Sequence, residues 1–386
     1  MITEVRQMKV LLSGGGTAGH VNPALAIADL IKAHDKRAKI AFVGTKNGIE
    51  NRLCEKAGYP IYHIEMSGLK RSLSLSNLKT AYYYFTAPGK AKKLLKSYKP
   101  DIVIGTGGFV CWPLLSAATK LGIPTALHES NAIPGKAVMM LSGKVDRIYV
   151  NFASAINCFH DKSKVLFVGN PMPKQSMESL PENIKEELDI PAGTKKILLS
   201  FGGSLGASRL NDEIISLMRG FSSAHPEIFH IHATGKSSHE ATMKKFREAG
   251  LDKYANLRMT EYIYDMPYWE RIADAVICRA GAMTVSEMAL QKKACILVPS
   301  PNVANNHQYE NAKRLADADA AVLIEEKNLT GEKLTEAVSR LLAGGEYIDA
   351  MRENIAAFAK PDANELIWRD IKILLSRDLM SLLNEK

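Results

Sequence analysis

The chain of 386 residues is longer than a single hydrophobic core usually supports, so two domains are expected, and its 46% hydrophobic and 24% charged residues exclude a disordered chain. Lys and Arg outnumber Asp and Glu by 50 to 41, which favours an anionic partner or surface. The five cysteines are scattered and form no CxxC pair, which argues against a disulfide framework or a zinc ribbon. No apolar run reaches ~18 residues, which argues against a transmembrane helix, and no signal peptide is recognised, so a cytoplasmic protein is predicted.

A glycine-rich motif occurs twice along the chain. Lys9–Gly19 reads KVLLSGGGTAG, and Lys196–Gly206, 187 residues later, reads KILLSFGGSLG, with seven of the eleven positions identical. Each copy predicts a strand, a glycine-rich turn and an amphipathic helix, the helices covering Pro23–Ala33 and Leu210–Arg219. Further apolar runs of strand length follow both copies: Lys39–Gly44, Asp101–Gly105, Pro124–His128, Arg147–Val150 and Val165–Gly169, then Phe229–Gly235, Ala275–Cys278 and Ala294–Pro299. Stretches of helical length, such as Gly48–Ala57 and Thr284–Gln291, separate these runs.

This alternation of strands and helices predicts an α/β protein made of two Rossmann-like domains with parallel sheets. We expect an N-terminal domain over residues 1–172, a C-terminal domain over 173–345, and a helical segment over 346–386 that packs back on the N-terminal domain. Ligands of open parallel sheets bind beyond the carboxyl ends of the strands. Two sheets facing a central cleft would therefore suit a reaction between two substrates.

The glycine loops of the first half predict an anion site. Gly14–Gly19 matches GxGxxG, but no acidic residue ends the next predicted strand, which argues against a dinucleotide cofactor. A second cluster, Gly105-Thr106-Gly107-Gly108, follows another predicted strand. Glycine allows backbone N–H groups to approach a diphosphate closely, and tight turns that need positive φ are the alternative explanation.

The segment Met66–Lys99 carries eight basic residues and no acid, interleaved with Leu, Tyr and Phe. The bases are Lys70, Arg71, Lys79, Lys90, Lys92, Lys93, Lys96 and Lys99, and the aromatic run is Tyr82 to Phe85. A solvated helix with its apolar side in the core would explain the pattern, but the concentrated charge favours an anionic membrane surface. No RNP-like motif supports RNA, so nucleic acid is not expected as a partner.

The second half contains Arg279–Glu287, RAGAMTVSE, directly after the apolar run Ala275–Cys278. A helix that begins after Gly281 would turn its first N–H groups toward a phosphate, and Glu287 would accept hydrogen bonds from a ribose diol. A capping box with Glu287 at its third helical position is the alternative. Asn305–Tyr309, NNHQY, follows a Pro-rich loop and offers further hydrogen-bonding groups.

No metal is expected, although two patterns resemble metal sites. Asp317-Ala318-Asp319 is formally DxD, but it follows the predicted helix Glu310–Ala316, and solvated helix-end charge explains it better. His225, His230, His232 and His239 lack a matching Cys or carboxylate pattern, which argues against zinc.

Taken in order, GGGTAGHVNPALAIA, GTGGFVCWP, HESN, GNP, GGSLGA, GAMTVSE and NHQYENA resemble the MurG family of bacterial peptidoglycan glycosyltransferases, from about Met8 to about Gly345. The resemblance implies the GT-B fold and an inverting hexosyltransferase that uses no cofactor. It implies transfer of GlcNAc from UDP-GlcNAc to the C4 hydroxyl of MurNAc in lipid I, which makes lipid II. It also implies a peripheral position on the cytoplasmic side of the cell membrane and contact with other cell-wall synthesis proteins. A UDP-GlcNAc 2-epimerase and a non-catalytic nucleotide-sugar-binding protein are the alternatives.

The resemblance assigns roles to individual residues. His20 is the expected general base, since an imidazole titrates near neutral pH, with Glu129 and His128 as the next candidates for base or orienting group. Gly105, Thr106, Gly107 and Gly108 form the acceptor and diphosphate loop. The residues expected to bind UDP-GlcNAc are Thr17, Ala18, Gly19, Asn131, Ser204, Ile263, Ala282, Met283, Thr284, Val285, Ser286, Glu287 and Gln308, of which Ser204 contacts the diphosphate, Ile263 the uracil, Glu287 the ribose and Gln308 the sugar.

Three positions depart from the family pattern. Ser130 stands where many members have Gln, and Pro173 stands where many have an Arg after the GNP motif. Phe109, Cys111 and Trp112 replace the usual Tyr, Ser and small residue of the second glycine loop. Without the Arg, helix N–H groups and Ser204 would carry more of the diphosphate charge.

Overall fold

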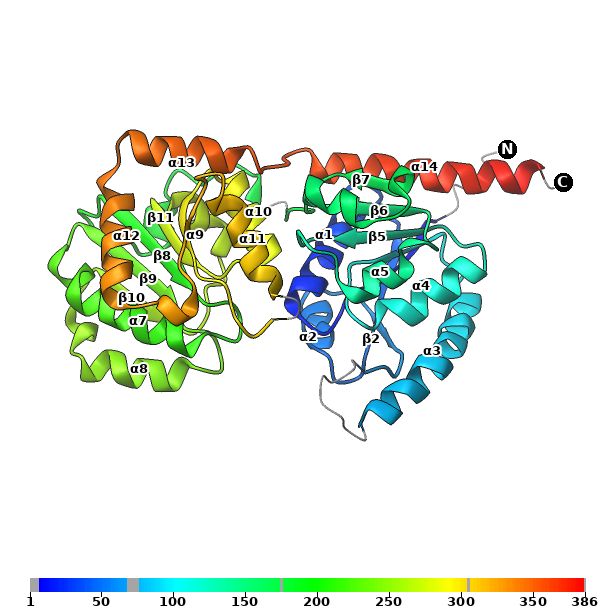
Figure 1. Cartoon of the computed structure of the whole chain (residues 1–386), viewed down its shortest axis with the longest axis horizontal. Helices are drawn as coiled ribbons and strands as arrows, with labels where there is room; N and C mark the ends of the chain where they lie inside the picture. The colour runs from blue at the N-terminus through cyan, green and yellow to red at the C-terminus, as the bar shows by residue number, and fades with distance from the viewer. Residues whose placement is uncertain (1–6, 68–75, 174–175, 304–305, 385–386) are drawn as a thin grey trace. The chain divides into compact units, whose positions relative to one another are not determined.

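The computed structural model describes residues 7–67, 76–173, 176–303 and 306–384, with the side chains of 76–79 and 377–384 left out. The chain divides into two compact units, one formed by residues 1–173 together with 360–386 and the other by 174–359. Each unit contains one parallel sheet covered by helices, so the expectation of two Rossmann-like α/β domains is confirmed (Figure 1).

The first unit contains a seven-stranded sheet in the order β3-β2-β1-β4-β5-β6-β7, in which every pair of neighbouring strands is parallel. The strands are β1 (Lys9–Ser13), β2 (Lys39–Gly44), β3 (Ile61–His63), β4 (Ile102–Gly105), β5 (Thr125–Glu129), β6 (Arg147–Val150) and β7 (Val165–Phe167). The helices are α1 (Ala18–His34), α2 (Ile49–Lys56), α3 (Ser76–Tyr98), α4 (Cys111–Lys120), α5 (Lys136–Ser142) and α14 (Ala363–Asn384).

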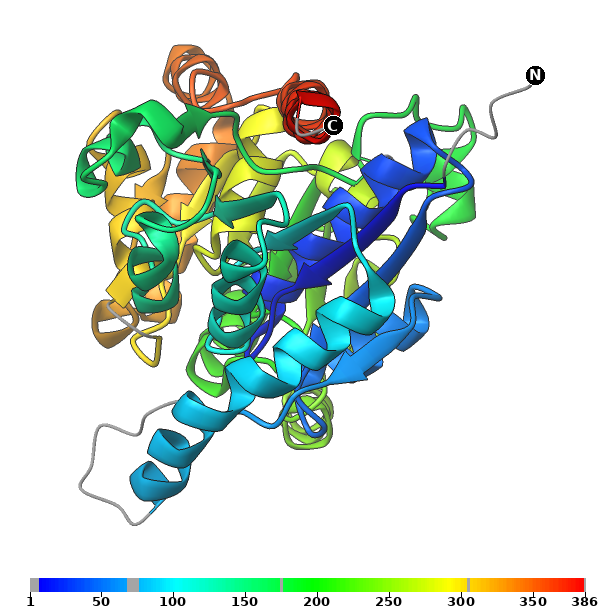
Figure 2. The same ribbon diagram turned by 90° about the vertical axis from the view of Figure 1, so that its right-hand side faces the viewer.

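Alternating strand residues build two cores, one on each face of this sheet. Along β1, Val10 and Leu12 pack with α1 and α14, whereas Leu11 packs with α3, α4 and α5. Figure 2 shows α14, in red, on the same face of the sheet as α1, in blue. Ile367 and Ile371 of α14 pack in the core on this face, with Val10 and Leu12. A sheet buried on both faces requires these nearly continuous apolar strands.

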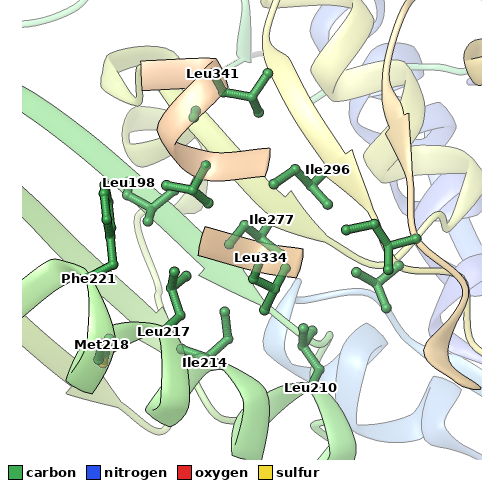
Figure 3. Packing of buried hydrophobic residues seen from close by; sticks show 14 of the residues in the cluster. Leu198, Leu210, Ile214, Leu217, Met218, Phe221, Ile277, Ile296, Leu334 and Leu341 are labelled. Carbon is green, nitrogen blue, oxygen red and sulfur yellow. The ribbon is translucent and has the colours of Figure 1, made fainter. Parts of the chain in front are cut away.

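The second unit contains a six-stranded parallel sheet in the order β10-β9-β8-β11-β12-β13. The strands are β8 (Lys196–Phe201), β9 (Ile228–Ala233), β10 (Leu257–Thr260), β11 (Ala275–Cys278), β12 (Ala294–Leu297) and β13 (Val322–Leu323). The helices are α6 (Ile184–Glu187), α7 (Ser208–Gly220), α8 (His239–Glu248), α9 (Met266–Ile272), α10 (Ala282–Leu290), α11 (His307–Ala316), α12 (Gly331–Ala343) and α13 (Glu346–Ala356). Figure 3 shows one core of this unit, where Leu198, Ile277 and Ile296 of the sheet meet Ile214 of α7 and Leu334 of α12.

The two glycine-rich motifs occupy equivalent places. β1 and β8 are the strands where the order of each sheet reverses, because each lies between the strand that follows it in sequence and a strand reached by a later crossover. Ligands of doubly wound sheets bind beyond the carboxyl ends of strands at this switch point. The repeat therefore sets one candidate site in each unit.

Two sequence expectations need correction. The helix after the first glycine loop begins at Ala18 rather than Pro23, because Thr17 is extended and its carbonyl accepts the first helical bonds. Pro23 is the sixth residue of this helix, so its missing N–H removes one i→i−4 hydrogen bond there. The C-terminal segment returns to the first unit at residue 360 rather than 346, since Ile348 and Met351 of α13 lie in the core of the second unit.

Candidate functional site

In the first unit, the two glycine loops are interlocked. The Gly15 N–H donates to the Gly107 carbonyl at 3.4 Å, and the Thr106 N–H donates to the Ser13 carbonyl at 2.8 Å. A Cβ on Gly108, whose φ is +83°, would lie 2.1 Å from the carbonyl oxygen of Gly15. Gly105–Gly108 therefore follows β4 in a conformation that only glycine allows at the closest approach.

His20 lies at this junction, in the first turn of α1. A Cβ on Gly107 would come within 2.6 Å of the His20 Nδ1, so the imidazole packs directly against the Gly107 backbone. The Thr106 hydroxyl donates to the His20 carbonyl at 2.5 Å. Thr17, Ala18 and Gly19 precede His20, and His20 is partly exposed. The structure thus brings together the expected base and the expected acceptor loop.

Glu129 ends β5 and Asn131 follows it, at the same edge of the sheet. The Glu129 carboxylate accepts from the Asn131 N–H at 2.9 Å, the Asn131 side-chain amide at 3.0 Å and the Gly135 N–H at 2.8 Å. Burial raises the pKa of Glu129, and these hydrogen bonds oppose the rise. This geometry holds the 131–135 loop in place and favours an orienting role for Glu129 over that of the base.

His128, the other candidate base, is fully buried. Its Nε2 lies 2.9 Å from the Gly169 carbonyl, and its Nδ1 lies 3.3 Å from the Ser130 hydroxyl. Burial lowers the pKa of His128 to about 4. Both ring nitrogens are engaged inside the protein, so His128 is positioned as a structural residue and Ser130 belongs to the same buried group.

In the second unit, hydrogen bonds link the loops that follow three neighbouring strands. The Lys236 N–H donates to the Ser204 carbonyl at 3.2 Å, and the Gly235 N–H donates to the Glu261 carbonyl at 3.0 Å. Gly206 has room only as glycine, since a Cβ would lie 2.2 Å from the Thr234 carbonyl oxygen. Ser204 and the loop with Ile263 are therefore held in one connected edge, beyond β8, β9 and β10.

The helix α10 carries Ala282, Met283, Thr284, Val285, Ser286 and Glu287. Gly281 is the residue before its first turn, with no side-chain cap, and Glu287 is the sixth helical residue. The capping-box alternative is therefore wrong, because a capping box needs its Glu at the third position. Glu287 keeps some exposed surface, yet the surrounding protein raises its pKa to about 7. The pKa of the buried Glu270 of α9 is raised well above its usual range by burial and by Glu287.

Gln308 lies in the first turn of α11. Its side-chain oxygen accepts the Ser300 N–H at 2.9 Å, which orients the amide so that the NH₂ group carries the donors. A cavity of about 500 Å³ adjoins this loop, lined by Arg209, Pro299, Ser300, Pro301, Asn306, Tyr309, Glu325, Glu326 and Lys327. Asn305 lies outside the described residues.

Sequence reasoning missed several polar residues that organise these loops. Arg279 pairs with Glu326 and donates to the Val298 carbonyl at 3.1 Å, so its charge serves the loop rather than being left for a ligand. Glu50 lies under the first glycine loop, where its carboxylate accepts the Gly16 N–H. In the sequence, the only signal for a buried side chain at Glu50 is the presence of glycines near it.

The buried histidines of β9 form a hydrogen-bonded chain instead of a metal site. His230 contacts Ser222 and Ser200, and His232 contacts Ser200 and Asn211, all at 2.8–3.0 Å. The expected helix-end pair also has a partner, since Asp317 accepts from Lys313 at 2.7 Å. Within the described parts of the chain, no group of three or more His, Cys, Asp or Glu side chains is arranged to hold a metal ion.

Two Rossmann-like units, each with a glycine-rich loop at the switch point of its parallel sheet, are the architecture of the GT-B fold. The model of the glycosyltransferase family 28 N-terminal domain matches residues 10–150, and that of the C-terminal domain matches residues 197–367. The crystal structure of MurG from Acinetobacter baumannii superposes with a TM-score of 0.72 at 29% identity, covering 95% of this chain and 99% of that one. A UDP-GlcNAc 2-epimerase from Neisseria meningitidis, solved bound to UDP-GlcNAc, reaches 0.65 at 14% identity over 94% of this chain and 99% of its own, which shows the shared fold alone.

Sequence relatives narrow the class further. A UDP-N-acetylglucosamine–N-acetylmuramyl-(pentapeptide) pyrophosphoryl-undecaprenol N-acetylglucosamine transferase of Acetivibrio thermocellus is 41% identical over 368 residues, covering 95% of this chain and 98% of the relative. The protein of the same name from Halalkalibacterium halodurans is 38% identical over 365 residues, covering 95% and 99%. The chain belongs to glycosyltransferase family 28 and, within it, to the MurG family of these transferases.

Proposed function

We propose that this chain transfers GlcNAc from UDP-GlcNAc to the C4 hydroxyl of the MurNAc residue in lipid I, undecaprenyl-diphospho-MurNAc-pentapeptide, and so makes lipid II for peptidoglycan synthesis. The observation that carries the proposal is the identity of about two fifths of the residues, over 95% of the chain, to relatives named for this reaction. The connected loop edge of the second unit and the His20 junction of the first supply the groups that the reaction needs.

The second unit binds the donor. Ser204 and the N–H groups of its loop meet the diphosphate, the Ile263 backbone meets the uracil, and Ala282–Glu287 surround the nucleotide. Support comes from the hydrogen bonds that link these loops and from Glu287, a carboxyl group on α10 near the protein surface. Gln308, with its amide oriented by Ser300, presents NH₂ donors to the sugar.

The first unit handles the acceptor. His20 takes the proton from the C4 hydroxyl as that oxygen forms its bond to the anomeric carbon of GlcNAc. The bond from this carbon to the diphosphate breaks, UDP leaves with the electron pair, and attack from the opposite face inverts the anomeric centre. Thr17, Ala18, Gly19 and Asn131 contribute contacts to the GlcNAc of the donor, and Gly105–Gly108 lie against the acceptor.

One transfer assay tests this function. The protein is incubated with UDP-GlcNAc labelled in the sugar and a short-chain analogue of lipid I, and the products are separated by chromatography. Label in a lipid-linked disaccharide with a β-configured new linkage supports the proposal. Conversion of UDP-GlcNAc to its 2-epimer without transfer, or binding without any reaction, would instead favour one of the alternatives.

The surface of α3 supports a peripheral position at the cytoplasmic face of the membrane. Tyr82 and Phe85 are 63% and 80% exposed, and they share one helical stripe with the exposed Lys92 and Lys96. Buried Ala87, Ala91 and Leu95 lie on the opposite side of the helix. Exposed aromatic residues beside lysines suit a headgroup region rich in anionic lipid.

Other parts of the basic segment have a different environment. Lys90 pairs with Glu65 at 2.6 Å, and Tyr84 stacks on Trp112 with ring centroids 3.8 Å apart. Lys70, Arg71 and the side chain of Lys79 lie outside the described residues. No helix in the described ranges is long and apolar enough to cross a bilayer. The proposed attachment therefore depends on the Tyr82–Lys96 stripe.

A further inference from the structure

Glu50 is a buried carboxylate directly beneath the first glycine loop. It is the second residue of α2, and only 1% of its surface is exposed. One carboxylate oxygen accepts the Gly16 N–H at 3.3 Å, and the other accepts both the Thr45 N–H and the Thr45 hydroxyl at 2.8 Å. The side chain thus joins the loop after β1 to the loop after β2.

The backbone around Glu50 leaves room for its carboxylate. A Cβ on Gly48 would lie 2.1 Å from the nearer carboxylate oxygen, and a Cβ on Gly44 would lie 2.5 Å from the Glu50 Cγ. A Cβ on Gly15 would come within 3.1 Å of the carboxyl carbon. Three glycines, one in the loop after β1, one at the end of β2 and one just before α2, are therefore in close contact with this one side chain.

The backbone N–H groups of a glycine-rich loop at the switch point are where a phosphate binds in many nucleotide sites. In this unit, one such N–H, that of Gly16, already donates to a carboxylate of the protein itself. The negative charge of Glu50 also opposes a second anion at the same place. The loop is therefore organised from within the protein.

We propose that Glu50 is a positioning residue of the transfer reaction: its carboxylate fills the anion position of the Gly14–Thr17 loop, fixes the start of α1 with His20, and excludes substrate phosphate from the Gly16 N–H. The inference rests on the proposed transferase function for its kinetic consequence. The anion position itself is testable without any transfer.

A Gln at this position tests the charge and both acceptor oxygens. Glu50→Gln keeps the shape but replaces one acceptor oxygen with an NH₂ group, which then faces a backbone or hydroxyl donor. Losing a hydrogen bond to a charged group is worth about 1.5–3 kcal/mol, so kcat/KM for the lipid I analogue is expected to fall ~10–150-fold, mainly through kcat. The Kd for UDP should stay within about twofold, because the proposed nucleotide site is in the second unit.

Two control variants separate positioning from stability. Thr45→Val removes a hydroxyl donor to the same carboxylate but leaves the Gly16 contact, so it should lower the melting temperature with transfer kinetics near those of the parent. Glu55→Gln removes an exposed carboxylate of the same helix and should change neither. If kcat/KM falls in proportion to the melting temperature in both Glu50→Gln and Thr45→Val, the loss reflects stability alone and the positioning role is wrong.

Formate provides the readout that needs no transfer. Glu50→Ala vacates the anion position, and formate is expected to raise the melting temperature of this variant while leaving the parent unchanged. If the parent transfers no GlcNAc yet formate stabilises Glu50→Ala, the proposed function fails and the anion position stands. If formate stabilises neither protein, or both equally, the carboxylate does not fill an anion position and the inference fails.

Discussion

The two units hold equivalent glycine loops in different ways. The loop after β1 is hydrogen-bonded to the loop after β4, and its Gly16 N–H donates to the Glu50 carboxylate. The loop after β8 instead contacts the loop after β9, where Gly206 lies against the Thr234 carbonyl. Around Gly202, Gly203 and Gly206, the atoms that a Cβ would meet belong to Ala207, Thr234, Gly235 and Ser238, and none is a carboxylate.

We propose that this difference lets one fold serve two ligands. A loop that contains a built-in carboxylate is organised before substrate arrives and disfavours phosphate at Gly16. In the loop after β8, the Gly206 N–H donates to the Gly203 carbonyl at 3.0 Å, and we propose that other N–H groups of this loop bind the diphosphate of the donor. We therefore expect variants of His20 and Glu50 in the first unit to change turnover of the acceptor, and variants of Ser204 and Glu287 in the second unit to change binding of UDP-GlcNAc.

The largest effect is expected from His20→Ala. Removing a general base costs on the order of 10²–10⁴ in rate, so kcat should fall by that factor while the Kd for UDP remains unchanged. Steady-state kinetics with the lipid I analogue and calorimetric titration of UDP measure both quantities. A near-normal kcat with a raised KM for the acceptor would make His20 a substrate-positioning residue, and Glu129→Gln would then be tested.

Acid is expected to destabilise the second unit through its buried histidines. Burial lowers the pKa of His230 well below the ordinary 6.5 and that of His232 to about 3, so both are neutral in the folded state. Their contribution to stability is complete above pH 6.5 and is lost as pH falls, because only the unfolded chain takes up the protons. Each histidine should lower the free energy of unfolding by about 1.4 kcal/mol for each pH unit below pH 6.5.

Urea unfolding followed by circular dichroism between pH 7.5 and 5 measures the slope. His128 of the first unit is also buried with a lowered pKa, so His230→Gln should flatten the dependence of the unfolding free energy by up to a third. His160→Gln, at an exposed position, should leave the slope unchanged. Equal slopes for parent and His230→Gln would show that other groups dominate the acid response.

Glu287→Ala should weaken the binding of UDP-GlcNAc by about 1.5–3 kcal/mol if the carboxylate accepts hydrogen bonds from the ribose diol. Because the pKa of Glu287 is raised to about 7, the accepting form is present above this pH and lost below it. Affinity should therefore rise about tenfold from pH 6 to pH 8 in the parent and stay flat in Glu287→Gln. An affinity for UDP-GlcNAc that is independent of pH in both proteins contradicts the assignment, and Glu248→Ala on the exposed surface is the control.

Much of the fold could be predicted because central strands carry a strong signal. The runs at Arg147–Val150 and Ala275–Cys278 coincide with β6 and β11, and both sheets are parallel as expected. The strands β3, β10 and β13 were missed, and each lies at an edge of its sheet with only two to four residues. The edge strand β7 is as short, but the apolar run Val165–Gly169 predicted it. Short edge strands take their conformation from a neighbour rather than from a periodic pattern.

The candidate site was less accessible to sequence reasoning. The family resemblance assigned both His20 and Gly105–Gly108 to the acceptor, and the structure places them together beyond the neighbouring strands β1 and β4. Sequence reasoning could not predict that Glu50 turns beneath Gly16, or that Asn211 ends the chain of His230 and His232, since these contacts join segments far apart in sequence. Such partners depend on side-chain direction after the chain has folded.

The smallest effect per residue is expected on membrane binding. Each lysine near an anionic surface contributes about 1 kcal/mol, so changing Lys92, Lys93 and Lys96 together to Gln should markedly reduce sedimentation with phosphatidylglycerol vesicles. Lys90→Gln should have a smaller effect than any one of these changes, because Lys90 already pairs with Glu65. The Kd for UDP should be the same in all variants, since the proposed nucleotide site is in the other unit.

Salt and apolar variants divide the binding into two parts. Raising ionic strength from 0.1 to 1 M shortens the Debye length from ~10 to ~3 Å, so the lysine contribution should disappear while the aromatic contribution persists. Replacing Tyr82 and Phe85 with Ser should remove the salt-resistant part and leave the salt-sensitive part, because the two aromatic rings and the lysines occupy one exposed stripe of α3. If the triple Gln variant and the double Ser variant both sediment like the parent, the Tyr82–Lys96 stripe is ordinary solvated surface, and lipid I must reach the His20 junction from another face of the first unit.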